Sequence, residues 1–193
     1  MSSAPSASEV PSFSPSTLSP TSSAAPTGVV NTLTTSEEGS SYESANGIMF
    51  DVVNKGNFPL RILSFGVNFR VDNCTFQLYT KGGTHYLSYE DQSAWNLNGQ
   101  GTLKRAPYPS KTKLPVRGQV TINQGESIAF YIAFLDCSGK WPLAVDRGEN
   151  YTFGAWVEDD HIAMMEGMNR RFPLTWDNPF GVGDDYPCKL CWM

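Results

Sequence analysis

Apolar residues recur at every second position in several parts of this chain, and this alternation restricts its fold more than any other feature. The longest case spans residues 63–71, where five apolar side chains alternate with other residues. Such a pattern predicts a half-buried β-strand. Leu60 and Ile62 have the opposite phase, so we expect a bulge near Ile62. Nowhere do apolar residues keep helical spacing for three turns, which predicts an all-β domain with any helix limited to single turns.

Turn residues divide the chain into short segments of this kind. The segment 120–135 is expected to form a hairpin, because Asn123, Gln124 and Gly125 separate two alternating runs. The last 20 residues are rich in Pro, Gly and Trp and are expected to be irregular. Short strands with regular turn signals indicate a single antiparallel β-sandwich, jelly-roll-like in type. Further strands are expected at 48–53, 74–78, 86–89, 95–103, 151–157 and 161–165.

The first 36 residues have a different composition. Ser, Thr and Pro occupy 22 of these positions, and Glu9 is their only charged side chain. Such a tract buries too little apolar surface to offset its chain entropy, so we expect it to be disordered. The composition is typical of O-glycosylated stalks. We therefore predict a disordered stalk or linker over residues 1–36 and a β-sandwich domain over residues 37–193.

The charge balance argues against a general nucleic-acid-binding protein. The formal net charge is −5 and the sequence pI is about 5.0, whereas such proteins need a basic footprint. One stretch without acidic residues is an exception, although three prolines interrupt it. It is either a solvated loop or an anion-binding strip for a sulfated or carboxylated polymer. Its cations are Lys104, Arg105, Lys111, Lys113 and Arg117.

The chain shows neither a membrane span nor a secretory leader. Its longest apolar run, from Ile128 to Leu135, falls short of the roughly 18 residues that a span requires. Met1 is followed by polar residues and not by an apolar segment of a signal peptide. Because the stalk nevertheless favours secretion, we expect the native N-terminus to lie upstream. A cytosolic protein with a low-complexity tail is the alternative.

Four cysteines permit three disulfide pairings, between which the sequence does not choose. We expect at least one disulfide, with Cys188 or Cys191 joined to the sandwich. Too few residues follow this CxxC pair for the helix of a redox enzyme, and a zinc site would need all four thiols. Asn73 and Asn150 begin glycosylation sequons, which favours an oxidising compartment. The four cysteines are Cys74, Cys137, Cys188 and Cys191.

Several short motifs between residues 45 and 135 resemble an uncharacterised β-sandwich module. They are residues 47–52, 63–65, 78–83, Trp95 and 124–131. The module is associated with secreted diatom proteins, where it is often repeated along Ser/Pro/Thr-rich linkers, and with some bacterial secreted proteins. The resemblance implies a β-sandwich in a secreted protein. It implies no chemistry, because the module has no catalytic residues to transfer, and the region after Cys137 departs from it.

Two groups of side chains are candidates for ligand binding. Glu158, Asp159 and Asp160 form the densest polar cluster and offer the hard oxygen ligands that calcium prefers. A solvated acidic loop is the alternative, and no other cofactor is expected. Aromatic residues form the second group, because a ring face suits the apolar side of a sugar, although packing is the ordinary role of such residues. These candidates are Trp95, Trp141, Trp156, Tyr86 and Tyr89.

No recognisable catalytic set is present. The sequence lacks G-x-S-x-G, H-E-x-x-H and phosphate-binding glycine motifs, and its only histidines are His85 and His161. We therefore expect a non-catalytic extracellular or wall-associated module for adhesion or polysaccharide binding, with a polysaccharide or matrix glycoprotein as partner. A carbohydrate-active enzyme that uses carboxylates and a structural matrix-assembly module are the alternatives. No nucleic-acid partner is expected, and the oligomeric state is left open.

Overall fold

The computed structural model describes Val30, Thr32, Leu33 and residues 42–67, 69–107, 110–137, 142–147, 154–170, 179–180 and 185–189. The chain separates into two units, Met1–Asn31 and Thr32–Met193, and the secondary-structure elements of the described residues belong to the second unit. The predicted stalk and its predicted boundary after Ser36 lie outside the described residues, apart from three positions.

The described part of the chain is all-β, as expected. It contains no α-helix, and its one helical turn is the 3-10 turn η1 (Gln92–Ala94), which Asp91 caps by accepting a hydrogen bond from the Ser93 amide. The strands are β1 (Tyr42–Ala45), β2 (Gly47–Asn54), β3 (Leu60–Val67), β4 (Asn73–Gly82), β5 (Asn96–Lys104), β6 (Thr112–Ile122), β7 (Ser127–Leu135), β8 (Leu143–Arg147), β9 (Ala155–Glu158), β10 (Ile162–Met165), β11 (Gly167–Arg170) and β12 (Asp185–Lys189).

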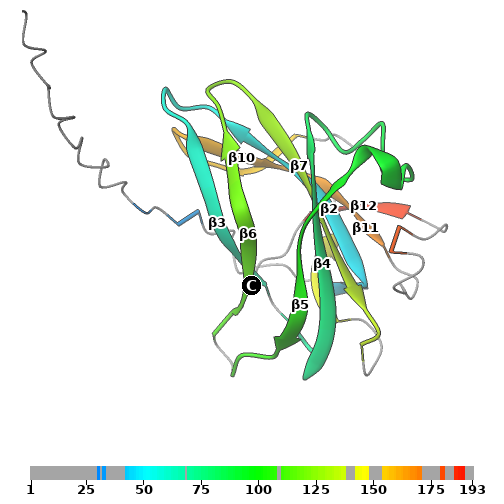
Figure 1. Cartoon of the computed structure of the whole chain (residues 1–193). Coiled ribbons are helices and arrows are strands. Elements are labelled where there is room, and N and C mark those ends of the chain that lie inside the picture. Colours follow the sequence, from blue (N-terminus) through cyan, green and yellow to red (C-terminus); the bar gives the residue numbers. More distant parts are fainter. Residues whose placement is uncertain are drawn as a thin grey trace, which may run out of the picture. The chain divides into compact units, whose positions relative to one another are not determined.

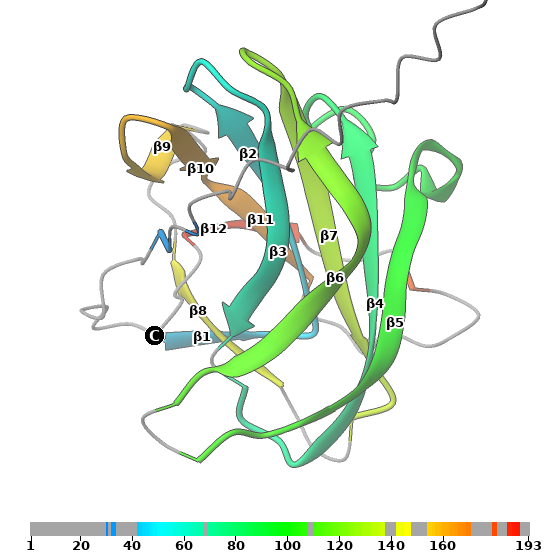
Figure 2. The same cartoon turned by 60° about the vertical axis from the view of Figure 1, so that its left-hand side comes forward.

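The strands form two antiparallel sheets of unequal size, which confirms the predicted β-sandwich. The larger sheet has ten strands in the order β1-β8-β12-β11-β2-β7-β4-β5, with β10 beside β2 and β9 beside β10. The smaller sheet consists of β3 and β6. Figure 1 shows these two strands as a separate layer to the left of β7, β2 and β4, and Figure 2 shows the same layer from its outer side, in front of β7. The fold therefore has one large sheet with a small sheet packed against one face.

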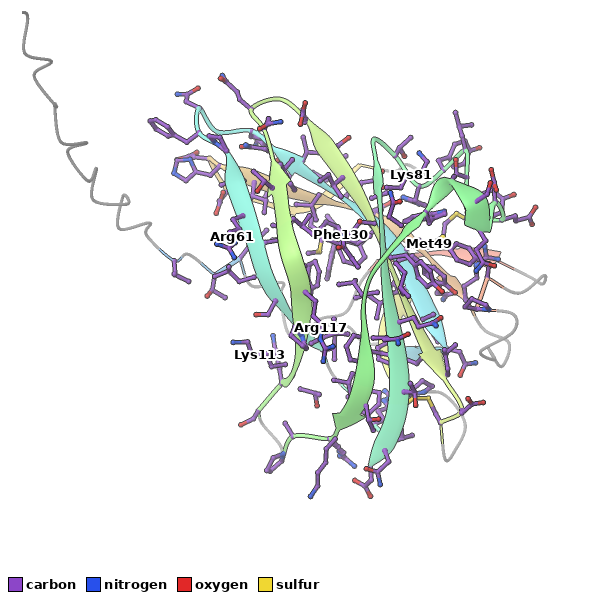
Figure 3. The ribbon with its side chains drawn as sticks, viewed as in Figure 1. Met49, Arg61, Lys81, Lys113, Arg117 and Phe130 are labelled. Atoms are coloured by element: carbon purple, nitrogen blue, oxygen red, sulfur yellow. A yellow bond between two sulfur atoms is a disulfide. The ribbon has the colours of Figure 1, made fainter. Side chains whose placement is uncertain are left out.

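The main core lies between the two sheets, and phenylalanine rings pack there among aliphatic side chains. Phe130 of β7 is fully buried, and its ring centroid lies 5.1 Å from that of Phe65 on β3 and 5.7 Å from that of Phe50 on β2. Figure 3 shows Phe130 between the two sheets. The buried residues that β3 and β6 contribute include Val67, Leu114 and Ile122. Burial of these alternating side chains holds the small sheet on the large one.

The opposite face of β7 is buried as well. Tyr131 packs in a second cluster, where its ring centroid lies 5.8 Å from that of Tyr79 and 4.8 Å from that of Phe180. Met49 belongs to this cluster, and Figure 3 places it on the side of the large sheet away from Phe130. The central strand thus separates two cores, because both of its faces carry apolar residues.

The hairpin predicted for residues 120–135 is wrong, although its turn is present. Glu126 closes the turn, since its amide donates to the Asn123 carbonyl and its carboxylate accepts from the Asn123 side chain, and Gly125 has a φ of 72°. However, β6 pairs with β3, whereas β7 pairs with β2 and β4. Alternation places both strands against a common core, and that condition is met equally by strands of one sheet or of two facing sheets.

Among the other local predictions, some are confirmed and others are wrong. The bulge near Ile62 is confirmed, because the β3–β6 register shifts between Ile62 and Ser64. The strand expected at residues 86–89 is wrong, and these residues form turns within a loop. The irregular C-terminal tail is wrong in part, since β12 pairs with β11 and β8. Local alternation did not predict β12, because this strand is short and contains Pro187.

The expected disulfide is confirmed, but with a different pairing. Cys74 at the start of β4 bonds to Cys137 just after β7, with their Cα atoms 4.5 Å apart. Both sandwich cysteines are therefore used, and the expected bond from Cys188 or Cys191 to the sandwich is wrong. Backbone pairing takes its place, since Cys188 lies opposite Gly167 of β11 and Arg147 of β8. Cys191 lies outside the described residues.

Candidate functional site

Half of the chain's cations gather around β3, β5 and β6. These strands come from two stretches that contain no Asp or Glu, residues 52–71 and 92–125. We call the result the basic surface. It consists of seven of the 14 lysines and arginines of the chain: Arg61, Arg70, Lys104, Arg105, Lys111, Lys113 and Arg117. The five cations predicted as an anion-binding strip are thus joined by two from β3 and the residues after it.

The outward side of the small sheet carries part of this surface. Lys113 of β6 lies opposite Gly66 of β3, and Arg61 lies opposite Thr121. Lys113 and Arg61 are exposed, and Figure 3 shows both along the small sheet on the side away from Phe130. The stem of Lys111 covers Gly66, with its Cβ 3.4 Å from where a Gly66 Cβ would be. The missing side chain of Gly66 therefore leaves room for lysine stems on this side.

Arg117 lies at the seam between the two sheets. Ile62 faces Val120 and Ser64 faces Pro115, so residues 116–119 bulge out of β6 opposite a single residue of β3. A bulge redirects the side chains that it contains. Figure 3 accordingly shows Arg117 between β6 and β5, the edge strand of the large sheet.

The connection from β5 to β6 extends the surface at the end of the sandwich. The Arg105 Nη1 donates to the Arg70 carbonyl at 3.4 Å, which brings cations from distant parts of the chain together. Lys104 lies opposite Asn73, the exposed first residue of β4 and a predicted glycosylation site. The second predicted site, Asn150, lies outside the described residues.

Five of these seven cations have no carboxylate partner within the part of the chain that the structure describes: Arg61, Lys104, Arg105, Lys113 and Arg117. By contrast, Lys55 lies 2.9 Å from Glu158. Because the five charges are exposed and not neutralised by ion pairs, their fields add in the solvent beside the small sheet.

A structural role accounts for some of the same residues. The small sheet has two free edges, and β5 forms a free edge of the large sheet. Proteins protect such edges from pairing with other chains by means of lysines, prolines and bulges. Lys113, Pro115 and the bulge at residues 116–119 fit that pattern. This role requires charge of either sign, whereas binding of an anion requires positive charge, so the two roles are separable by experiment.

The aromatic residues predicted to bind sugar do not form one platform. Trp95 is only 6% exposed, and its indole N–H donates to the Ser88 carbonyl at 2.7 Å. Its ring packs with Tyr131 and Phe180 in the second cluster. Trp95 is therefore a core residue, and its ring faces are not open to a ligand.

The remaining aromatic candidates are separated. Tyr89 packs against the second cluster and lies under the guanidinium of Arg170, 5.6 Å from its ring centroid. Trp156 packs against the main core, on the other face of the large sheet. Tyr86 is 49% exposed, and Trp141 lies outside the described residues. No shared aromatic surface connects these side chains among the residues that are described.

The acidic candidates for calcium are engaged locally. The carboxylate of Asp159 accepts hydrogen bonds from the amides of His161 and Ile162 at 2.7 and 2.9 Å, which closes the turn between β9 and β10. The His161 bond is the main reason why the pKa of Asp159 is lowered. Glu158 pairs with Lys55, and Asp160 is exposed. No three His, Cys, Asp or Glu residues in the described ranges are grouped to hold a metal ion.

A second polar cluster lies beneath the loop of residues 83–95, and no sequence pattern other than the rarity of histidine pointed to it. Oδ1 of Asp51 on β2 accepts from both the amide and Nδ1 of His85, at 2.9 and 2.8 Å. The Arg170 guanidinium donates to the Tyr89 carbonyl of the same loop. His85 is 1% exposed, so this arrangement is closed to solvent and serves to anchor the loop on the large sheet.

Comparison with known proteins identifies no relative. No family model matches the chain, and searches of curated proteins and of solved structures find no match. The structure thus supports an all-β, two-sheet antiparallel domain and identifies no family. In the part of the chain that is described, no helix has the length and apolar character needed to cross a membrane.

Proposed function

We propose that this domain is a non-catalytic module that binds acidic polysaccharide through the basic surface, as part of an extracellular or wall-associated adhesion protein. The observation that carries the proposal is the set of five exposed cations without a carboxylate partner within the described residues, on a chain of net charge −5. An acidic protein with one positive region attracts polyanions to that region and repels them elsewhere.

Four features support the extracellular part of the proposal. The Cys74–Cys137 disulfide persists most readily in an oxidising compartment. Asn73 is exposed at the start of β4, where a glycan would extend into solvent. The resemblance of residues 45–135 to a module of secreted diatom proteins, and the stalk-like composition of residues 1–36, point the same way.

No enzymatic function is proposed, because two of the three carboxylates in the cluster of residues 158–160 are engaged in other contacts. Glu158 is paired with Lys55, and Asp159 bonds two amides of its own turn. A glycosidase would need two carboxyl groups facing one cleft about 5–9 Å apart. The basic surface supplies cations, which suits binding of an acidic polymer and not its hydrolysis.

Charge reversal at two matched lysines tests the proposal. Lys113→Glu changes the basic surface, whereas Lys81→Glu changes the net charge equally on β4, where the ammonium group donates to the Thr84 carbonyl. Binding of the full chain to dextran sulfate, polygalacturonate and neutral dextran would be measured at several salt concentrations. We expect both acidic polymers to bind, and neutral dextran not to bind.

The two variants are expected to differ clearly. Lys113→Glu should weaken binding to the acidic polymers about tenfold, which corresponds to about 1.4 kcal/mol, and Lys81→Glu should weaken it less than twofold. Because glutamate protects a sheet edge as well as lysine does, edge protection predicts no loss of binding. Equal losses for both variants, or tighter binding to single-stranded DNA than to either polysaccharide, would contradict the proposal.

A further inference from the structure

On the basis of the proposed function, we infer that Arg117 is the specificity-determining residue, or anchor, of the basic surface. Its guanidinium binds one oxyanion of the polymer at the seam between β5 and β6. The group recognised is a carboxylate or a sulfate ester on a polysaccharide. The evidence is the contact that this exposed side chain, which has no carboxylate partner in the described residues, makes with a second strand.

Two glycines of β5 form that seat. A Cβ placed on Gly99 would lie 3.5 Å from the Cβ and 3.6 Å from the Cγ of Arg117, and 3.8 Å from its backbone nitrogen. A Cβ placed on Gly101 would lie 4.0 Å from an Nη atom of Arg117. The arginine therefore runs along β5 from Gly99 toward Gly101, in space that the two glycines leave open.

The seat limits the positions that the guanidinium adopts. An arginine or lysine that is free in solvent loses rotamer entropy when a ligand immobilises it. The stem of Arg117 is already packed against Gly99, so less of that entropy remains to be lost on binding. Lys113, by comparison, lies opposite Gly66 of β3, on the outward side of the small sheet.

The chemistry of the guanidinium defines the ligand group. Its planar fork of N–H donors bonds two oxygens of one oxyanion at once, whereas an ammonium group acts as a point charge. Arg117 is exposed and has no carboxylate partner among the described residues, so this fork is open to solvent. Further acidic groups of an extended polymer would then interact with Lys113 and Arg61 through less specific electrostatic attraction.

Conservative substitutions distinguish a specific anchor from general electrostatic attraction by the basic surface. Arg117→Lys keeps the charge and removes the fork, and Arg61→Lys is the matched control on β3. Affinity for dextran sulfate and for polygalacturonate would be measured for both variants across a salt series. We expect Arg117→Lys to weaken binding about three- to tenfold and Arg61→Lys to weaken it less than twofold. The slope of log affinity against log salt should stay unchanged, because counterion release depends on the number of charges.

A second variant tests the seat without touching a charge. Gly99→Val fills the space that the Arg117 stem occupies, so it should lower the affinity by a similar factor, while Gly82→Val, at a glycine with no neighbour within 4 Å of its Cβ position, serves as a folding control. Circular dichroism and urea unfolding would confirm that each variant is folded.

The outcomes distinguish the anchor from the underlying proposal. Wild-type affinity in Arg117→Lys, together with a large loss in Lys113→Glu, would overturn the anchor and leave polyanion binding intact. Absence of binding to both acidic polymers by the unaltered chain would overturn both. A larger loss with polygalacturonate than with dextran sulfate would identify carboxylate as the preferred group, and the reverse would identify the sulfate ester.

Discussion

The two faces of the large sheet are covered by different kinds of structure. On one face, the strands β3 and β6 lie over a core of phenylalanines, and their backbone groups are bonded within their own small sheet. On the other face, the loop of residues 83–95 and the segment at Pro179 and Phe180 cover Tyr79 and Tyr131. A strand pair is thus opposed by irregular backbone across the same ten-stranded sheet.

This difference explains where polar side chains are buried. A strand pair brings most of its own hydrogen bonds, so the residues beneath it are mainly apolar. Asn54 at the end of β2 is a buried exception, and its amide donates to the Ile122 carbonyl of β6. Irregular backbone has to find partners elsewhere, because a buried N–H or C=O without one is costly. Asp51, Trp95 and Tyr131 supply bonds of this kind to His85, Ser88 and Pro179. The first face is therefore held mainly by apolar contact, and the second by apolar contact together with specific hydrogen bonds.

Adjacent residues of β7 test the contrast most directly, since Phe130 and Tyr131 point to opposite faces. Phe130→Ala removes a ring that contacts both sheets and should lower the free energy of unfolding by about 3–5 kcal/mol. Urea unfolding followed by fluorescence would measure this loss. A loss below 1 kcal/mol would mean that the small sheet is not held by the phenylalanine core.

Removal of the Asp51 carboxylate tests the second face. Asp51→Ala leaves the buried amide and ring of His85 without this acceptor, so the free energy of unfolding should fall by about 1–3 kcal/mol. Amide hydrogen exchange should rise in residues 83–95 and stay unchanged in β3 and β6. Equal increases on both faces would show that the loop and the small sheet are not independent.

Tyr131→Phe removes a single hydroxyl, which donates to the Pro179 carbonyl, and leaves the ring in place. The expected loss is about 1 kcal/mol, because one buried hydrogen bond is lost and the apolar contact is kept. Comparison of its unfolding midpoint with that of Phe130→Ala measures how the two faces differ along one strand. A loss as large as that of Phe130→Ala would contradict the division between them.

Asp159 makes the same kind of contact as Asp51 but in water, and its removal should have the smallest effect. Asp159→Ala should cost about 0.5 kcal/mol near neutral pH, because exposed charged contacts contribute little. The bond from the His161 amide holds the pKa of Asp159 below its ordinary value of 3.8. The charge-dependent part of this stabilisation is therefore fully present above about pH 4 and is lost as the pH falls through the lowered pKa. The unfolding midpoints of the variant and the wild type should therefore differ at pH 6 and lie closer together at pH 2.5.

Alternation predicted the strands of this fold better than it predicted their partners. The run from Leu63 to Val71 and the opposite phase of Ile62 identified β3 and its bulge. The same rule assigned β6 and β7 to one hairpin, because an inward-facing residue has the same pattern in either sheet. The apolar residues on both faces of β7 were the signal that it is a central strand, with β2 and β4 already on its two sides.

The candidate site was predictable only where its residues are close in sequence. Five cations of the basic surface lie within residues 104–117 and were visible as a group. Arg61 joins them through the pairing of β3 with β6, which no local pattern encodes. The seat of Arg117 depends on a bulge and on two glycines of another strand, so composition alone gave no reason to single out this arginine.

The Cys74–Cys137 bond has a consequence for proteolysis. It spans 63 positions of the chain, which include β5, β6 and the connection between them. Exposed lysines and arginines in that connection are the natural targets of trypsin-like proteases. A cut after Lys104 or Arg105 would leave one fragment with Cys74 and the other with Cys137, so the two pieces would stay covalently joined. The domain would migrate as one species until a reductant separated them, and a single cut in this connection would not release either half.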